Sequence, residues 1–154
     1  MPTPFIALCI DPGAVCGAAY LDLAAPRASQ IVALDSGTFA GVYAEVRDPI
    51  SYVPDAVVIE DTRGLPIYAR NRLKGRAREK AVRDVGRIDA MCDLLEDAAR
   101  GAGRAVHLYV PHGPKWSADV LKQTTGYEGR TNQHTRDAVR AGWGLTPAMI
   151  ARSV

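Results

Sequence analysis

The sequence predicts an α/β protein in which a mixed five-stranded sheet is flanked by helices. Three extended segments near the start of the chain are joined by short connections, which favours an antiparallel meander. Two further strands are linked by helical patterns, which favours a sheet with helices packed on its faces. The length of 154 residues suits one compact domain over residues 1–154.

The strands of the meander are short runs that end at turn residues. The first run is apolar on both faces, which is typical of a central, fully covered strand. The connections contain Asp11-Pro12-Gly13 and Ala24-Ala25-Pro26-Arg27, and both are turn sequences. In chain order, we expect these strands at Phe5–Ile10, Cys16–Leu23 and Gln30–Phe39.

The rest of the chain alternates between helices and strands. Its clearest signal is an apolar stripe at steps of three and four residues, which predicts a long helix that covers the sheet. The stripe consists of Val82, Val85, Ile88, Cys92, Leu95 and Ala99. We expect a short helix at Gly41–Ile50, a strand at Ala56–Glu60, a loop at Arg63–Asn71, the long helix at Ala77–Arg100 and a strand at Ala105–Val110. A last helix is expected from a cap at Thr131 or Asn132 to about Trp143, closed by Gly144 and Pro147. This order of elements is shared by the ribonuclease H-like fold.

Four polar residues at the ends of regular elements form a candidate site. Asp11 and Glu60 each end an apolar strand, and in this strand order the two strands would be neighbours. His134 and Asp137 are three residues apart at the start of the last helix, so they share a helix face. Hard cations such as Mg²⁺ prefer carboxylate oxygens that are held rigidly. Because successive side chains on a strand face opposite sides, only one of Glu60 and Asp61 is expected to enter the site.

Each of these residues also has a simpler explanation. Asp11 lies in a common turn sequence, and Glu60 could be a solvated carboxylate at a loop start. His134 could cap or pack against its helix, and Asp137 is favourable near any helix N-terminus. The combination of the four residues, rather than any one of them, therefore indicates a divalent-metal hydrolase site.

Several segments resemble motifs of the RuvC-type Holliday junction resolvases, and of phage-borne members in particular. The shared patterns are an apolar strand ended by Asp-Pro-Gly, a second one ended by Glu, a Pro-x-x-x-Trp-type segment and a helix start with His-x-x-Asp. They fall on Ala7–Gly13 with the following Gly17, Val57–Glu60, Val110–Trp116 and Asn132–Ala138, and Asp84–Ile88 fits the family's small-residue helix. The family has either His or Asp at the position of His134. The stretch between Thr38 and Asp55 is short for the family.

The resemblance implies a metal-dependent nuclease that hydrolyses phosphodiester bonds in four-way (Holliday) or other branched DNA. It implies two divalent ions, Mg²⁺ or Mn²⁺, with Asp11 bridging them, Glu60 holding one, and His134 and Asp137 completing the coordination. Lys115 fits the position of a catalytic lysine at the scissile phosphate. A homodimer is also implied, because resolving a junction requires two symmetric cuts.

A basic run beside the predicted catalytic strand end indicates a DNA-binding surface. Between Arg63 and Arg87 the chain has nine Lys or Arg residues and only two acidic ones. Such residues neutralise phosphates, although the same run could be a solvated helix face. Tyr68 could stack on an unpaired base or pack on the long helix. The predicted DNA contacts are Arg63, Tyr68, Arg70, Arg72, Lys74, Arg76, Arg78 and Lys122.

Composition and length bear on the remaining classes of protein that this sequence could belong to. The net charge of +2 says little about partners, and Cys9 and Cys92 lie in apolar patterns expected for the core. We expect a cytoplasmic protein without a membrane partner, because no signal-peptide pattern or bilayer-length apolar run occurs.

Actin-like ATPases and sugar kinases have a related fold but need a second domain, for which we expect no room. A same-fold nuclease acting on flaps or single strands, and a non-catalytic DNA-binding module, stay open as alternatives.

Overall fold

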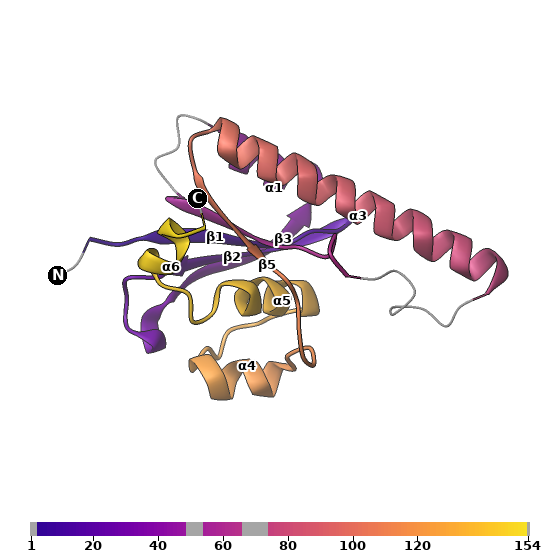
Figure 1. Ribbon diagram of the computed structural model, residues 1–154. Helices are drawn as coiled ribbons and strands as arrows, with labels where there is room; N and C mark the ends of the chain where they lie inside the picture. The colour runs from indigo at the N-terminus through magenta and orange to yellow at the C-terminus, as the bar shows by residue number, and fades with distance from the viewer. Residues whose placement is uncertain (1–2, 49–53, 66–73, 154) are drawn as a thin grey trace.

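A mixed five-stranded sheet forms the centre of the protein (Figure 1). The computed structural model describes residues 3–48, 54–65 and 74–153. Across the sheet, the strands are β3 (Ile31–Thr38), β2 (Val15–Asp22), β1 (Ile6–Asp11), β4 (Ala56–Glu60) and β5 (Ala105–Tyr109). The β1–β2 and β2–β3 pairs are antiparallel, whereas the β1–β4 and β4–β5 pairs are parallel. The predicted fold class and the predicted meander are confirmed.

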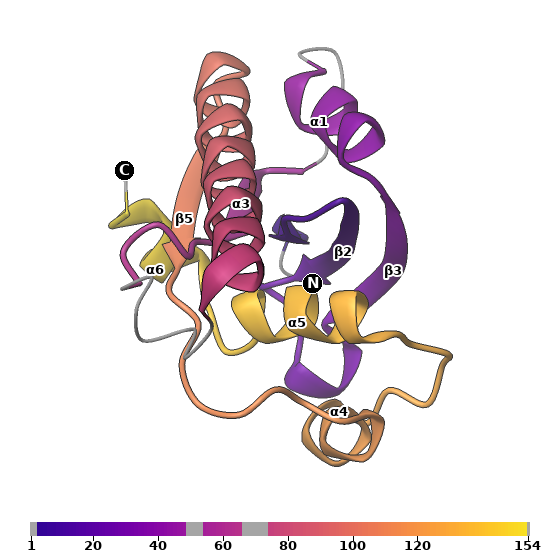
Figure 2. The ribbon, with the colours of Figure 1, turned by 90° about the vertical axis from the view of Figure 1, so that its right-hand side faces the viewer.

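Helices cover both faces of this sheet (Figures 1 and 2). The helices α1 (Phe39–Arg47) and α3 (Gly75–Gly101) lie on one face. The opposite face is covered by α5 (Gln133–Gly142), with α4 (Ala118–Thr125) and α6 (Pro147–Ala151) beside it. A short 3₁₀ turn, η1 (Arg27–Ser29), connects β2 to β3.

The alternation of side chains along β1 and β4 divides the core into two layers. Leu8 and Ile10 point toward α1 and α3, whereas Ala7 and Cys9 point toward α5. All four side chains are fully buried, which explains why this segment is apolar on both faces. The same alternation decides which way the polar residues at the strand ends point.

The long helix α3 is covered only over its C-terminal half. Its buried residues are Cys92, Leu95 and Ala99, whereas Val82 is 42% exposed. Figure 1 shows the N-terminal half of α3 projecting beyond the sheet. The prediction that the whole apolar stripe covers the sheet was therefore wrong at its start, at Val82, because the helix extends farther than the strands that it packs on; from Ile88 onward the stripe packs against the core.

Two helices were not predicted. Ser117 caps α4 by accepting a hydrogen bond from the amide of Val120, and Thr146 caps α6 in the same way from Met149. Pro147 is thus a residue of the first turn of α6, where proline is favourable, and not only the stop of the preceding helix. Within residues 3–48, 54–65 and 74–153, every helix is either too short or too polar to span a lipid bilayer.

Candidate active site

Asp11 and Glu60 lie side by side at the carboxyl ends of two neighbouring parallel strands. The register pairs Ile10 with Ile59, so the carboxylates that follow are adjacent across the sheet. Both residues continue the rows of side chains that point toward α5. The predicted neighbourhood of these strand ends is confirmed.

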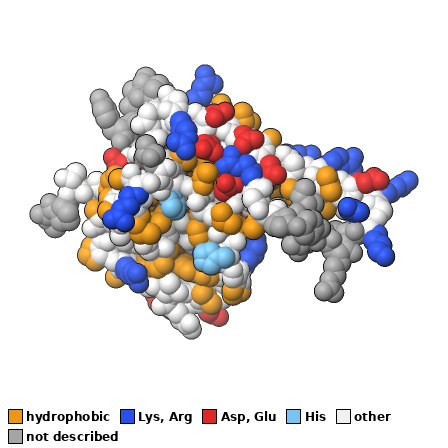
Figure 3. All heavy atoms as spheres, in the orientation of Figure 1, with side chains coloured by type: hydrophobic (Ala, Val, Ile, Leu, Met, Phe, Trp, Pro, Cys, Tyr) orange, Lys and Arg blue, Asp and Glu red, His pale blue; other side chains and the backbone are white. Residues whose placement is uncertain are grey.

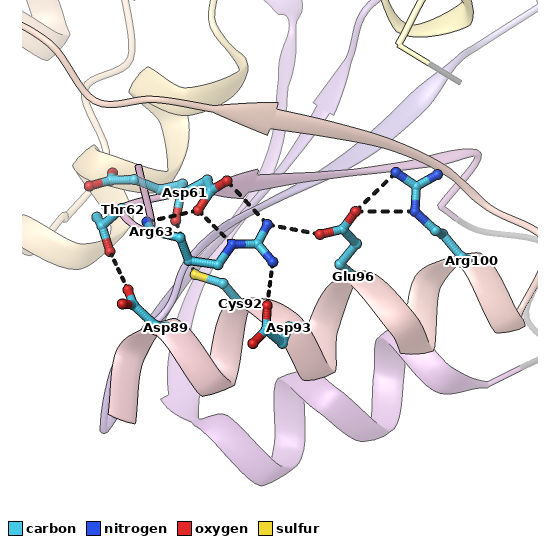
Figure 4. Close-up of polar contacts among 9 residues, drawn as sticks. Asp61, Thr62, Arg63, Asp89, Cys92, Asp93, Glu96 and Arg100 are labelled. Carbon is cyan, nitrogen blue, oxygen red and sulfur yellow. Dashed lines mark hydrogen bonds and ion pairs between the residues drawn. The ribbon is translucent and has the colours of Figure 1, made fainter. Parts of the chain in front are cut away.

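Asp61 points to the other face, where it pairs with Arg63 (Figure 4). Arg63 Nε lies 2.8 Å from Asp61 Oδ1, and its two terminal nitrogens lie 2.6 Å from Asp93 Oδ1 and 2.8 Å from Glu96 Oε2 on α3. This network ties the end of β4 to α3. It also lowers the pKa of the Asp61 carboxyl, mainly through the hydrogen bond from Arg63. Of the pair Glu60 and Asp61, it is therefore Glu60 that enters the site.

Helix α5 brings the other two predicted site residues to the strand ends. Asn132 starts the helix with a capping box, in which its side chain accepts from the amide of Thr135 and the Thr135 side chain accepts from the amide of Asn132. His134, in the first turn, places its Nδ1 2.9 Å from Asp11 Oδ2. The side chains of His134 and Asp11 are thus in direct contact, although they are 123 residues apart in the chain.

Glycines allow α5 to lie directly on the sheet at both of its ends. A Cβ atom at Gly17 of β2 would overlap the backbone carbonyl of His134, and one at Gly142 would overlap Sγ of Cys9. Gly17 is paired with Asp11 in the β1–β2 register. The same glycine therefore sets the distance between the first carboxylate and the start of the helix.

Asp137 is the buried member of the site. Its side chain is 2% exposed, and its two oxygens accept different donors. Lys115 Nζ lies 2.9 Å from Oδ2, and Gln133 Nε2 lies 2.7 Å from Oδ1. The charge of the buried carboxylate is thus balanced by a lysine whose own side chain is 69% exposed.

These residues surround a cleft of about 630 Å³ between α3 and the Asp-Pro-Gly turn. Asp11, Glu60, His134 and Lys115 line it from the sheet side. The opposite wall is formed by residues of α3, and these are Lys80, Asp84, Arg87, Ile88 and Met91. The cleft is therefore acidic where the strands end, whereas the α3 wall carries Arg87 and an ion pair of 2.7 Å between Lys80 and Asp84.

Repulsion and burial act on the carboxylates of the cleft. The pKa of Glu60 is raised to about 7, first by burial and then by the neighbouring charges of Asp11 and Asp137. Burial also raises the pKa of Asp11, against the opposing hydrogen bond from His134. A cation placed among these groups would relieve the repulsion.

The donor set fits a hard divalent ion by its chemistry. It comprises three carboxylates with mutual repulsion and one imidazole, at rigid positions on strand ends and a helix. Among the residues that the structure describes, however, no three His, Cys, Asp or Glu side chains already lie close enough together to hold a metal ion. Lys115 and Gln133 take both oxygens of Asp137, and His134 takes one of Asp11. The assignment of Asp11, Glu60, His134 and Asp137 as ligands of Mg²⁺ or Mn²⁺ stays a prediction.

The predicted DNA contacts other than Arg63 fall into three groups. Lys74, Arg76 and Arg78 are exposed at the start of α3, where Figure 3 shows Lys and Arg side chains gathered on the projecting end of the helix. Tyr68, Arg70 and Arg72 lie outside the described residues. Lys122 is exposed on α4 and forms an ion pair of 2.7 Å with Glu128.

Arg63 requires a correction. Its side chain is only 23% exposed, and its guanidinium already binds Asp61, Asp93 and Glu96. Because these carboxylates neutralise it and fix it against α3, Arg63 is not assigned to the DNA surface. Two other basic residues of the same run, Lys80 and Arg87, line the cleft instead.

Sequence reasoning missed three polar residues of α5 that contact Asp137 or the segment that carries Lys115. Gln133 donates to Asp137, and Arg136 and Arg140 donate to carbonyl groups of the segment that carries Lys115. The spacing of Gln133, Asp137 and Arg140 at steps of four and three residues places them on one helix face. That spacing was the available signal, and it could have been recognised beside the His-x-x-Asp pattern.

Comparisons with known proteins identify the fold. No family model and no curated protein matches the sequence. Among solved structures, the T. thermophilus RuvC in complex with a Holliday junction substrate aligns over 96% of this chain and 95% of that chain, with 18% identity and a TM-score of 0.61. The N-terminal RNase H domain of a Mycobacterium tuberculosis protein aligns over 91% and 99% with 11% identity, but its TM-score of 0.34 is too low to support an argument. The protein thus has a RuvC-like fold of the ribonuclease H type, as its motifs predicted.

Proposed function

We propose that this protein is a metal-dependent endonuclease that resolves four-way (Holliday) or other branched DNA junctions. The observation that supports this most is that Asp11, Glu60 and His134, from three separate elements, line one cleft of a RuvC-like fold, with Asp137 buried behind its rim on Lys115. Turn formation or solvation would explain each residue alone. Neither explains why Asp11 and Glu60, on neighbouring strands, and His134, on a helix, line the same cleft.

The chemistry of the site follows from which groups line the cleft. Asp11, Glu60, His134 and Asp137 would hold Mg²⁺ or Mn²⁺, and such ions lower the pKa of water and offset the negative charge of a phosphate. Lys115 presents an ammonium group at the rim of the cleft, within reach of a phosphate oxygen. Asp137 keeps that ammonium group near the strand ends through the 2.9 Å contact.

The α3 side of the cleft supplies affinity for the DNA backbone. Arg87 lines the cleft, and Lys74, Arg76 and Arg78 carry positive charge along the projecting end of the helix; Lys80, also in the lining, is paired with Asp84 at 2.7 Å. Contacts of this kind bind phosphates whatever the base sequence. Selection of a branched shape requires contacts on more than one arm, for which we propose the predicted homodimer.

The test is cleavage of a synthetic four-way junction with Mg²⁺ or Mn²⁺, against EDTA, by the wild type and two variants. Asp11→Asn and Glu60→Gln should keep the fold and junction binding but lose nearly all cleavage, because each removes a charge that a divalent ion needs. The matched control is Asp97→Asn, an exposed carboxylate of α3 that does not line the cleft. Wild-type rates for Asp11→Asn at saturating metal would overturn the site assignment.

The same assay separates the alternatives. Flap and single-stranded substrates, tested beside the junction, distinguish a junction resolvase from a same-fold nuclease with another substrate. Tight binding of the junction without cleavage under any metal condition would indicate a non-catalytic DNA-binding module. Sedimentation of the protein with and without junction DNA tests the homodimer.

A further inference from the structure

The segment that carries Lys115 is fastened to α5 by its backbone carbonyl groups. Arg140 donates from Nη2 to the carbonyl of His112 at 2.8 Å and from Nη1 to that of Pro114 at 3.0 Å. Arg136 donates from Nε to the carbonyl of Trp116 at 3.0 Å. The residues immediately before and after Lys115 are therefore both held by the helix that also carries Asp137.

Lys115 depends on this fastening because its side chain is not held by packing. The side chain is 69% exposed, and a lysine has a flexible four-carbon stem. The position of its ammonium group thus depends on the position of the Lys115 backbone and on the contact with Asp137. With the backbone fixed on both sides, the ammonium group searches a small region that includes Asp137 and the rim of the cleft.

Arg140 is an unusual residue for a purely structural contact. Its side chain is nearly buried, at 9% exposed, and its third partner is the hydroxyl of Tyr109 at 3.2 Å. Among the residues that the structure describes, no carboxylate forms an ion pair with it. Burying a charge without a paired carboxylate is costly unless hydrogen bonds and nearby opposite charges compensate.

We propose that Arg140 is a positioning residue that holds the ammonium group of Lys115 at the rim of the cleft, with Arg136 fixing the other side of the same segment. The part of this inference that concerns catalysis rests on the proposed function. The part that concerns the position of Lys115 stands without it. The two parts are therefore tested by separate measurements.

The first measurement is structural and needs no DNA. The variant Arg140→Met keeps the length and apolar packing of the side chain but removes the donors to His112 and Pro114. In ¹H–¹⁵N spectra of lysine ammonium groups at mildly acid pH, the wild type should show a Lys115 signal protected by Asp137, identified by its loss in Lys115→Met. Arg140→Met should lose that signal, and the backbone order parameters of His112, Gly113 and Lys115 should fall from the rigid range of about 0.85 toward about 0.6. The matched control is Arg130→Met, since Arg130 is exposed.

The second measurement is kinetic. Arg140→Met should lower kcat for junction cleavage about tenfold with little change in KM, because the substrate still binds but the ammonium group is misplaced. Arg140→Lys, which keeps the charge and one donor, should recover part of the rate. In a Lys115→Met background, Arg140→Met should cost nothing further, since its effect passes through Lys115.

Each outcome decides the proposal. It is overturned if the Lys115 signal is missing from the wild type, if the signal and the backbone order parameters are unchanged in Arg140→Met, or if the loss of rate is the same in the Lys115→Met background. If Arg140→Met does not fold, Arg140→Lys replaces it in the structural measurement: lower order parameters between His112 and Lys115 support the proposal, and unchanged ones overturn it. If the wild type cleaves no DNA, the proposed function fails, and the spectra alone decide the positioning of Lys115.

Discussion

Replacing Gly17 by Ala tests whether the distance between β2 and α5 sets the geometry of the site. A Cβ atom at this position would overlap the backbone carbonyl of His134 and lie 2.9 Å from the amide nitrogen of Thr135. An ordinary contact begins at 3.4 Å, and both opposing atoms belong to the backbone, so no side chain can turn away. The start of α5 and the strand would therefore have to separate by about 1 Å or more.

The consequences for the site follow from this separation. His134 Nδ1 is in hydrogen-bond contact with Asp11 Oδ2, at 2.9 Å, and Gly17 is paired with Asp11 itself. Moving the helix by about 1 Å breaks that contact, and a displacement of this size costs about 10² in the rate of a positioned reaction. Overpacking a buried contact also costs about 1–3 kcal/mol of folding stability. The expected phenotype is a folded but destabilised protein with junction cleavage lowered about a hundredfold.

The assay compares Gly17→Ala with Gly37→Ala. Gly37 lies on the neighbouring strand β3, and a Cβ atom there meets nothing within 4 Å, so this control variant should keep its stability and its cleavage rate. Thermal unfolding and cleavage at saturating metal are measured for both proteins. Wild-type cleavage by Gly17→Ala would show that α5 can move without harm to the site and would refute the reasoning. An equal loss in Gly37→Ala would refute it as well.

Two further predictions concern the charged residues. Arg63→Met should lower the free energy of unfolding by about 2 kcal/mol at neutral pH and leave junction affinity unchanged. Arg63 lowers the pKa of Asp61 below its ordinary value of 3.8 and that of Glu96 below 4.5. The stabilisation by Arg63 is therefore present above these ordinary values and is lost as the pH falls through the lowered pKa values, so the denaturation curves of wild type and Arg63→Met should converge in acid. A loss of junction affinity at unchanged stability would contradict this prediction. Replacing the exposed residues at the start of α3 by Ala should flatten the plot of log affinity against log salt by roughly 0.9 for each DNA phosphate that the variant no longer neutralises. The residues replaced in this variant are Lys74, Arg76 and Arg78. An unchanged slope would mean that they form a solvated helix face and do not contact DNA.

Much of the fold and half of the site were predictable because their signals are local in the chain. A strand buried on both faces is apolar up to its last residue, as in β1 before Asp11, and β4 repeats the pattern before Glu60. The order of these strands implies that Asp11 and Glu60 meet, and the period of two implies that Asp61 cannot join them. Each strand is recognised from residues within a few positions of one another, and the order of the recognised elements along the chain then supplies the pairing.

The partners of the charged side chains could not be predicted in the same way. Arg63 lies in a basic run, yet the fold brings the acidic residues Asp93 and Glu96 of α3 to it and takes it away from the surface. Short caps such as Ser117 are too common to distinguish a helix like α4 from a turn.

The exposure of the first half of α3 and the fastening of the Lys115 segment to Arg136 and Arg140 were decided by the tertiary structure. Periodicity reports that a face is apolar but not how far the sheet beneath it extends. Likewise, a long cationic side chain binds whichever carbonyl or carboxylate the packing of distant elements places within its reach, and no pattern in the chain records that distance. The physical reason is that the tendency of a side chain to be buried is a property of each residue, whereas ion pairs and carbonyl contacts depend on the final positions of whole helices and strands.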